Sequence, residues 1–341
     1  MSAGRSPWRR AWERFKRHRV GYFSLWAFLV LLGIALISPL LANERPLLAH
    51  YQGKTYLTIF MNYPETQFGG NFLTPVDWYD PFIRGQFAKH GNWAVYTLIR
   101  YSPNSVNYND YEAHPAAPSR AHWLGTDPNG RDIVARLLFG FAVSVLFGIA
   151  LTVVGTLIGI AAGAIQGYFG GWIDLTGQRL IDLWNAIPIL YILIILAAMF
   201  EPSIVLLLFL FAIFGWTTLS DYVRAEFLRN RSLEFVKAAR AMGLSHWRII
   251  RRHVLPNSMT PVITFMPFRM SEGILGLTAL DFLGLGVPSS VPSLGELLRF
   301  SKENLDAWWI GIPTFAVLVV TLLLLTFIGD ALRDAFDTRK G

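Results

Sequence analysis

The sequence predicts an all-α polytopic membrane protein of six transmembrane helices, with an external insert of mixed structure between the first and second helices. Three observations predict this fold class. The chain of 341 residues is 53% hydrophobic, and its mean hydropathy of +0.40 is high for a soluble domain. Apolar runs long enough to cross roughly 30 Å of hydrocarbon recur along the chain. Basic residues cluster beside these runs, which is typical of cytoplasmic segments.

The first apolar run predicts a membrane helix that is retained in the mature protein. Residues 1–20 carry seven Arg or Lys residues and one Glu, and the helix is expected within residues 21–42. A cleaved signal peptide would have a shorter apolar core than this run, and a cleavage site of small residues would follow it; no such site follows here. The basic end is therefore expected in the cytoplasm.

Residues 43–139 form the predicted external, periplasmic insert. They are rich in Pro, Gly, Asn and aromatic residues, contain no apolar run of span length, and carry equal numbers of basic and acidic residues. Short strands and turns are expected here. The run Gly53-Lys54-Thr55 matches the end of a phosphate loop, but Leu48 stands where that loop needs Gly, so the match is attributed to chance.

Two carboxylates near the end of the insert have a structural explanation. Asp127-Pro128-Asn129-Gly130 is a strong turn sequence, because Pro presets φ and Gly accepts the exit geometry. Asp132 then precedes an apolar stretch, where it can cap a helix. We therefore interpret Asp127 and Asp132 as a turn residue and a cap rather than as a catalytic pair.

A predicted five-helix core occupies residues 140–330, and a short cytoplasmic tail follows at 331–341. The spans of this core are expected at about 141–166, 183–200, 204–223, 261–285 and 310–328. Pro188 predicts a kink in one of them. Small residues recur every four positions in the first, which predicts a face for close helix packing, with a pore-facing role as the alternative. They are Gly155, Gly159, Gly163 and Gly167.

Three charged residues fall within the predicted span at 261–285. They are Arg269, Glu272 and Asp281. An Arg at the bilayer midplane costs about 2.5–3.5 kcal/mol on insertion scales, so these side chains are expected to face protein, water or a partner. Arg269 and Glu272 are three residues apart and can pair along one helix. A role in the translocation path remains the alternative for all three.

The polar loop within residues 224–260 predicts two helices joined by a turn at Gly243. Residues at helical spacing define the two helices: Leu233, Val236, Ala239 and Arg240 before the turn, and Trp247, Ile250 and Val254 after it. Gly243 is expected to adopt a positive φ, Ser245 can cap the second helix, and Pro256 is expected to end it. A basic loop on anionic lipid is the alternative.

This loop resembles the EAA loop of ABC-importer permeases, through Lys237-Ala238-Ala239, Gly243 and Leu255-Pro256. In that family the loop is implied to dock into a cleft of the cytoplasmic ATPase. Lys237 occupies the place of the motif's Glu, so a pairing that depends on that carboxylate is not carried over. His253 also stands where Ile is usual. The residues implied to contact the ATPase are Lys237, Ala238, Ala239, Gly243, Leu244, Ser245, Trp247, Leu255 and Pro256.

Further runs resemble the dipeptide and oligopeptide permease family. The run LGTD-x-x-GRD at 124–132 is similar to the motif that precedes the family's second span. The runs at 284–288 and 292–295 are similar to its fifth-span exit and the periplasmic segment that follows. The insert, with ANERPLL and NYPETQFGG, resembles the branch related to microcin C uptake. The resemblance implies the type I ABC importer permease fold and an importer of oligopeptides or peptide-like compounds such as microcin C.

The resemblance also implies a location and a set of partners. The location is the bacterial inner membrane, with both termini cytoplasmic. The partners are a second permease subunit, two ATPase subunits or domains, a periplasmic peptide-binding protein and membrane lipid, but no nucleic acid. Because this chain lacks a phosphate-loop motif, ATP and Mg²⁺ are expected in the ATPase partner, and neither a cofactor nor a catalytic residue is expected here. Cys is absent, and the seven His residues lack metal-ligand spacing, so no metal site is predicted.

Two other functions remain open from the residues alone. A stand-alone channel or secondary transporter is the first, although ion-coupled transport favours paired intramembrane carboxylates and broken helices. A membrane-anchored periplasmic enzyme built on residues 43–139 is the second, although no nucleophile elbow or metal-binding set is visible there.

Overall fold

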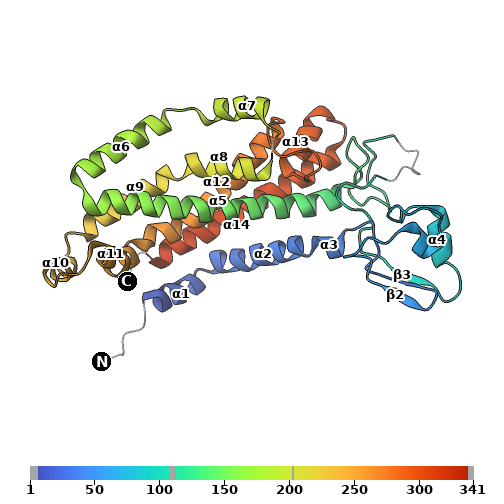
Figure 1. The fold of residues 1–341 in the computed structure, drawn as a ribbon, viewed down its shortest axis with the longest axis horizontal. Coiled ribbons are helices and arrows are strands. Elements are labelled where there is room, and N and C mark those ends of the chain that lie inside the picture. Colours follow the sequence, from blue (N-terminus) through green and yellow to red (C-terminus); the bar gives the residue numbers. More distant parts are fainter. Residues whose placement is uncertain (1–6, 107–112, 202, 337–341) are drawn as a thin grey trace. The chain divides into compact units, whose positions relative to one another are not determined.

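The computed structural model describes residues 7–106, 113–201 and 203–336, and helices dominate it (Figure 1). The chain divides into two compact units. The first comprises residues 1–29, 145–288 and 319–341, and the second comprises residues 30–144 and 289–318. The helices outside the polar loop are α1 (Pro7–Arg17), α2 (Arg19–Leu36), α3 (Ser38–Leu41), α4 (Pro81–Phe87), α5 (Ile133–Phe169), α6 (Gly171–Asn185), α7 (Ile189–Met199), α8 (Ile204–Gly215), α9 (Thr217–Asn230), α12 (Met259–Phe282), α13 (Leu294–Glu303) and α14 (Trp308–Phe336).

The apolar helices support a protein that crosses the membrane several times. Among the described residues, four stretches are long and apolar enough to cross: α2, α5, α8 with α9, and α14. The bent pair of α6 and α7 is a fifth if it acts as one span. The predicted count of six would also need α12, which has 24 residues and carries Arg269, Glu272 and Asp281. Six spans therefore stay a prediction.

Several element boundaries differ from the sequence-based ranges. α5 begins at Ile133, within the range assigned to the insert, and α14 extends to Phe336, within the range assigned to the tail. The segment between the spans expected at about 141–166 and 183–200 is largely helical, because α6 begins at Gly171. The kink at Pro188 is confirmed: this residue precedes α7, and the axes of α6 and α7 differ by 61°. Proline ends helical hydrogen bonding because it has no N–H to donate.

The glycine face of α5 packs against α9 in the first unit. A Cβ atom built at Gly159 would lie 3.0 Å from the Trp216 carbonyl oxygen and 3.1 Å from Leu219 Cβ. One built at Gly167 would lie 2.6 Å from both the Arg224 carbonyl oxygen and Phe227 Cβ. These distances leave no room for a side chain, so the interpretation of the glycines as a packing face is confirmed.

The second unit contains a small antiparallel sheet formed by β1 (Leu48–Tyr51), β2 (Lys54–Tyr56) and β3 (Trp93–Val95). The strand order is β2-β1-β3, and Ala49 of β1 pairs with Tyr56 on one side and Ala94 on the other. Helix α4 lies beside β2 and β3 (Figure 1). Phe68, Trp78 and Ile83 are buried with strand residues in one aromatic cluster. This cluster supplies the insert with an apolar core of its own.

Candidate functional site

The polar loop after α9 folds into short helical segments (Figure 1). Its segments are α10 (Glu234–Ala241), α11 (His246–Ile249), a wide turn η2 (Ile250–Val254) and a tight turn η3 (Leu255–Ser258). The buried residues of these segments pack on α9 within the first unit. They form one cluster that includes Val223, Phe227, Val236, Ala239, Ile249, Ile250 and Val254.

Gly243 forms the turn between α10 and α11. Its φ is +74°, as the sequence predicted. The Gly243 N–H donates to the Arg240 carbonyl at 2.9 Å, and the Leu244 N–H donates to the Ala239 carbonyl at 3.2 Å. These two bonds form the Schellman motif that commonly ends a helix. Among the described residues, no atom lies within 4 Å of a Cβ built at Gly243, so backbone conformation, not lack of space, favours glycine here.

Two expectations about the second half of the loop were wrong. Ser245 occupies the position before α11, but its side chain makes no capping hydrogen bond. Pro256 does not end the helical region, because it lies in η3 and η3 leads directly into α12. Proline is tolerated in the first turn of a helix, where its missing N–H would have no intrahelical partner.

Lys237 has a local acidic partner. Its Nζ lies 2.8 Å from Glu234 Oε1, three residues earlier on the same helix. Both side chains are exposed, and such a surface pair adds little stability. The cation at the position of the motif's Glu is therefore balanced by an acid of the same helix turn.

The loop exposes large apolar side chains among its charged ones. Met242 and Trp247 are 72% and 70% exposed, and Ala238 is also exposed. Leu244 and Leu255 are half-buried and pack against the loop's inner cluster. Neighbouring exposed large apolar side chains are typical of a contact surface for another protein. Ala239 is the buried member of the predicted docking residues. The exposed members are Lys237, Ala238, Gly243, Ser245, Trp247 and Pro256.

Residues that the sequence reasoning missed tie the loop to the end of α5. The Tyr168 hydroxyl and His246 Nδ1 are 2.9 Å apart in a hydrogen bond. The Arg240 guanidinium lies 5.1 Å from the centre of the Tyr168 ring, a distance suited to a cation–π contact. Arg231 donates to the Tyr168 carbonyl at 3.3 Å. Only a weak signal in the sequence pointed to the role of Tyr168, namely an aromatic residue at the end of an apolar run.

The charged residues of α12 have separate surroundings. Arg269 is buried, and its Nη2 donates to the Gly215 carbonyl at 2.9 Å. That carbonyl lies at the end of α8, where helix carbonyls lack intrahelical partners. Within the described part of the chain, Arg269 makes no ion pair with exposed Glu272, so the predicted pairing was wrong. Buried Asp281 accepts from the Val287 N–H at 2.7 Å and holds the turn after α12.

In the second unit, the acidic residues of the LGTD-x-x-GRD run act as predicted. Asp127 Oδ1 accepts from the backbone N–H groups of Asn129 and Arg131, both at 2.9 Å. Asp132 Oδ1 accepts from the Ala135 N–H at 2.8 Å in the first turn of α5. The turn and the helix cap are confirmed.

The same run also supports a buried network of charges. Arg131 Nε lies 2.7 Å from Asp127 Oδ2, and its Nη2 lies 3.5 Å from Glu296 Oε1 of α13. Arg136, whose side chain is fully buried, is also paired with Glu296. The sequence reasoning missed Arg131, Arg136 and Glu296 as a group, because Glu296 lies 160 residues beyond Arg136. Buried charges need such partners to offset the loss of hydration.

Comparisons with known proteins agree with this arrangement. Residues 155–341 match the family described as binding-protein-dependent transport system inner membrane component. Residues 6–64 match the N-terminal transmembrane domain of oligopeptide transport permease C. The solved MetNI methionine ABC transporter, in an inward-facing conformation, has a chain that matches with a TM-score of 0.50 and 15% identity, over 60% of this chain and 98% of that chain. This likeness confirms the helical permease fold over the part of the chain that it covers, whereas the six spans and the external insert stay predictions.

Relatives in sequence cover most of the chain. The inner membrane ABC transporter permease protein YejE of Escherichia coli (strain K12) is 46% identical over 96% of both chains. The peptidoglycan transport system permease protein YejE of Agrobacterium fabrum is 44% identical over 98% of this chain and 95% of its own. The glutathione transport system permease protein GsiD of Pectobacterium atrosepticum is 34% identical over 72% and 81%. With its apolar helices, the chain is a multi-pass inner membrane protein, and it belongs to the binding-protein-dependent transport system inner membrane components, the permease subunits of ABC importers.

Proposed function

We propose that this permease imports oligopeptides or peptide-like compounds and forms half of a translocation pathway. The names of its relatives support the substrate class, since they refer to peptide, glutathione and peptidoglycan transport. Microcin C is the finer proposal, and the insert's resemblance to that branch supports it. Glu272, the exposed charge of α12, is the better candidate for the pathway, because Arg269 and Asp281 are buried and hydrogen-bonded.

The loop 232–257 is the proposed dock for the ATPase. The observation that carries this proposal is that the loop has two faces: one is buried, and the other exposes large apolar side chains. The buried face packs on α9, and the exposed face presents Met242 and Trp247. A partner that binds the exposed face of the loop can thereby move α9, because the loop and α9 are packed together. Hydrolysis of ATP with Mg²⁺ is assigned to the partner.

Permeases of this family work with an ATPase, a substrate-binding protein and a second permease. The finer composition proposed here is two ATPase subunits or domains, a second permease subunit and a periplasmic peptide-binding protein. Both termini are proposed to be cytoplasmic and the insert periplasmic. The basic residues 1–20 and the neutral segment 43–139 support this orientation.

The test compares Gly243→Val with a matched glycine outside the loop. Gly53 has a φ of +79° and open space at its Cβ position, as Gly243 has, but it lies in the β1–β2 turn. Valine resists a positive φ at both positions, so both variants carry a similar backbone strain. We expect Gly243→Val to reach the membrane but to lose ATPase co-purification and peptide uptake, whereas Gly53→Val keeps both.

Lys237→Ala completes the test, because it removes charge without altering the turn. It should weaken uptake less than Gly243→Val does, since the exposed pair with Glu234 adds little. If the loop only lies on lipid, Lys237→Ala should be at least as damaging as Gly243→Val. Normal ATPase binding and uptake in Gly243→Val would refute the docking proposal.

A further inference from the structure

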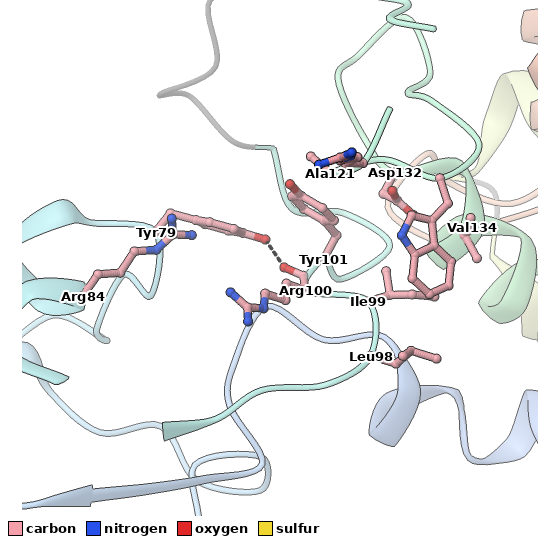
Figure 2. A pocket seen from close by; sticks show the side chains of 11 residues that line it. Tyr79, Arg84, Leu98, Ile99, Arg100, Tyr101, Ala121, Asp132 and Val134 are labelled. Atoms are coloured by element: carbon pink, nitrogen blue, oxygen red, sulfur yellow. Dashed lines mark hydrogen bonds between the residues drawn. The ribbon is translucent and has the colours of Figure 1, made fainter. Parts of the chain in front are cut away.

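A cavity of about 430 Å³ opens within the second unit (Figure 2). Its size lies within the range of small-molecule sites, which is roughly 300–1,000 Å³. Three arginines line it: Arg84, Arg100 and Arg120. A smaller neighbouring cavity of about 290 Å³ shares Arg84 and Arg100, so these two side chains border both hollows.

The positive charge of the cavity is not neutralised from within. In residues 7–106, 113–201 and 203–336, none of the three lining arginines has an acidic partner within ion-pair distance. Asp132 also lines the cavity, but it already accepts from His122 at 2.9 Å and caps α5. Glu44 borders the smaller cavity and accepts from the Ser102 hydroxyl at 3.4 Å. Exposed arginine forks that converge on a hollow are suited to a carboxylate ligand.

The opposite end of the cavity is apolar. Figure 2 shows Leu98, Ile99 and Val134 on one side of the cavity, with Arg84 and Arg100 on the side of Tyr79. Leu98 is 67% exposed, so its side chain is accessible to a ligand in the cavity. The cavity thus separates a cationic end from an apolar end.

Aromatic residues hold the cationic end in place. The Tyr79 hydroxyl donates to the Arg100 carbonyl at 2.7 Å, and the Tyr79 ring lies 5.5 Å from the Arg84 guanidinium. The Tyr96 ring lies 4.8 Å from the Arg100 guanidinium. Arg84 Nε donates to the Trp78 carbonyl at 3.1 Å, which leaves its terminal nitrogens for a ligand. Groups positioned in advance lose less conformational entropy on binding.

We propose that this cavity binds a short acidic peptide, with a carboxylate between Arg84 and Arg100 and an apolar side chain against Leu98, Ile99 and Val134. The choice of a peptide rests on the proposed function, whereas the site itself rests on the residues of the insert. The ligand would therefore carry an apolar side chain and at least one carboxylate, as an acidic dipeptide does.

The test uses the full-length protein in phosphatidylcholine nanodiscs without ATPase partners. Isothermal titration calorimetry would compare acetyl-Leu-Glu with neutral acetyl-Leu-Gln-amide. We expect the neutral probe to bind at least ~10-fold more weakly, and Arg84→Gln or Arg100→Gln to weaken binding of the acidic probe by about 10-fold, which corresponds to 1.4 kcal/mol. Higher salt should weaken the acidic probe further, because both arginines are exposed.

Two further variants separate the cavity from general attraction to a basic surface. Lys54→Gln removes an exposed cation of the same insert outside the cavity and should leave binding unchanged. Leu98→Asp places an acid at the apolar end and should abolish binding of acetyl-Leu-Glu. Arginine-to-glutamine changes at exposed positions should leave the thermal unfolding temperature unaltered, which checks that each variant is folded.

The proposal is overturned if the acidic probe does not bind, if both probes bind equally, or if Lys54→Gln weakens binding as much as Arg100→Gln does. It is also overturned if Arg100→Gln impairs association with the periplasmic binding protein while peptide binding is unchanged, since the cavity would then accept a protein partner. ATP-driven peptide uptake by the assembled complex is measured separately. Normal uptake without probe binding refutes this site alone, whereas absent uptake of any peptide refutes the proposed function.

Discussion

Gly163 of α5 is the position where a single methyl group should reveal how closely α5 packs on α9. A Cβ at this position would lie 2.9 Å from Val223 Cβ and 3.0 Å from the Arg224 backbone nitrogen, and it would also overlap the Ser220 carbonyl oxygen. Backbone atoms cannot rotate away as a flexible side chain can. Overpacking costs about 1–3 kcal/mol, so we expect the steric penalty of Gly163→Ala to be near the upper end of that range.

Gly33 of α2 supplies the matched control. Replacing a helical glycine by alanine gains about 0.8–1.0 kcal/mol of helix propensity. In the part of the chain that the structure describes, no atom lies within 4 Å of a Cβ built at Gly33, so Gly33→Ala should show this gain without a steric penalty. Subtracting the same gain from the penalty at Gly163 leaves a net destabilisation of about 2 kcal/mol for Gly163→Ala.

The assay is the free energy of unfolding in mixed micelles, titrated with sodium dodecyl sulfate and followed by tryptophan fluorescence. Gly163→Ala should unfold at a lower detergent fraction than the wild type, and Gly33→Ala at an equal or higher one. If the two variants behave alike, α5 and α9 are not packed as closely as the structure indicates, and the reasoning fails.

Three further predictions concern the charge network, one tyrosine and the topology. Glu296→Gln removes the acid that pairs with fully buried Arg136 and should lower the free energy of unfolding by about 3 kcal/mol in a detergent titration; an unchanged value would contradict the network. Burial raises the pKa of Tyr79, so the folded protein keeps this phenol protonated where the unfolded chain ionises it. Its contribution to stability should be complete below about pH 10 and fall above it, and Tyr79→Phe should reduce that alkaline loss in unfolding measured between about pH 8 and 11. Because the sequence contains no Cys, a thiol introduced at exposed Leu73 should react with an impermeant reagent in spheroplasts and one at exposed Met242 only after lysis; the reverse pattern would refute the proposed orientation.

The sequence alone was sufficient for features that depend on local chemistry. The apolar runs predicted most helices, since length and composition decide whether a segment can cross a membrane. Gly243 was predicted to have a positive φ because few other residues adopt it, and Asp127 and Asp132 were predicted as a turn residue and a cap. The four-residue spacing of the α5 glycines likewise predicted a packing face, because that spacing places them on one side of a helix.

Expectations failed where the outcome depended on distant partners. Pro256 was expected to end a helix, but it lies where a new helical segment begins. Arg269 was expected to pair with Glu272 from their spacing, yet it donates to the Gly215 carbonyl. A buried arginine needs an acceptor in its own surroundings. The Gly215 carbonyl becomes available to Arg269 because the end of α8 lies beside α12 in the folded chain.

The most specific features of the molecule were decided by tertiary structure. Glu296 meets Arg136 across 160 residues, and Tyr168 meets His246 across 78. The cavity of the second unit is likewise lined by Arg84, Arg100 and Arg120, which come from separate segments of the insert. The spacing of apolar residues in the sequence indicates which face of a segment is apolar, but it does not indicate which other segment packs against that face. The partners of buried charges and the lining of a cavity are set only when the chain folds and distant residues come within a few ångströms.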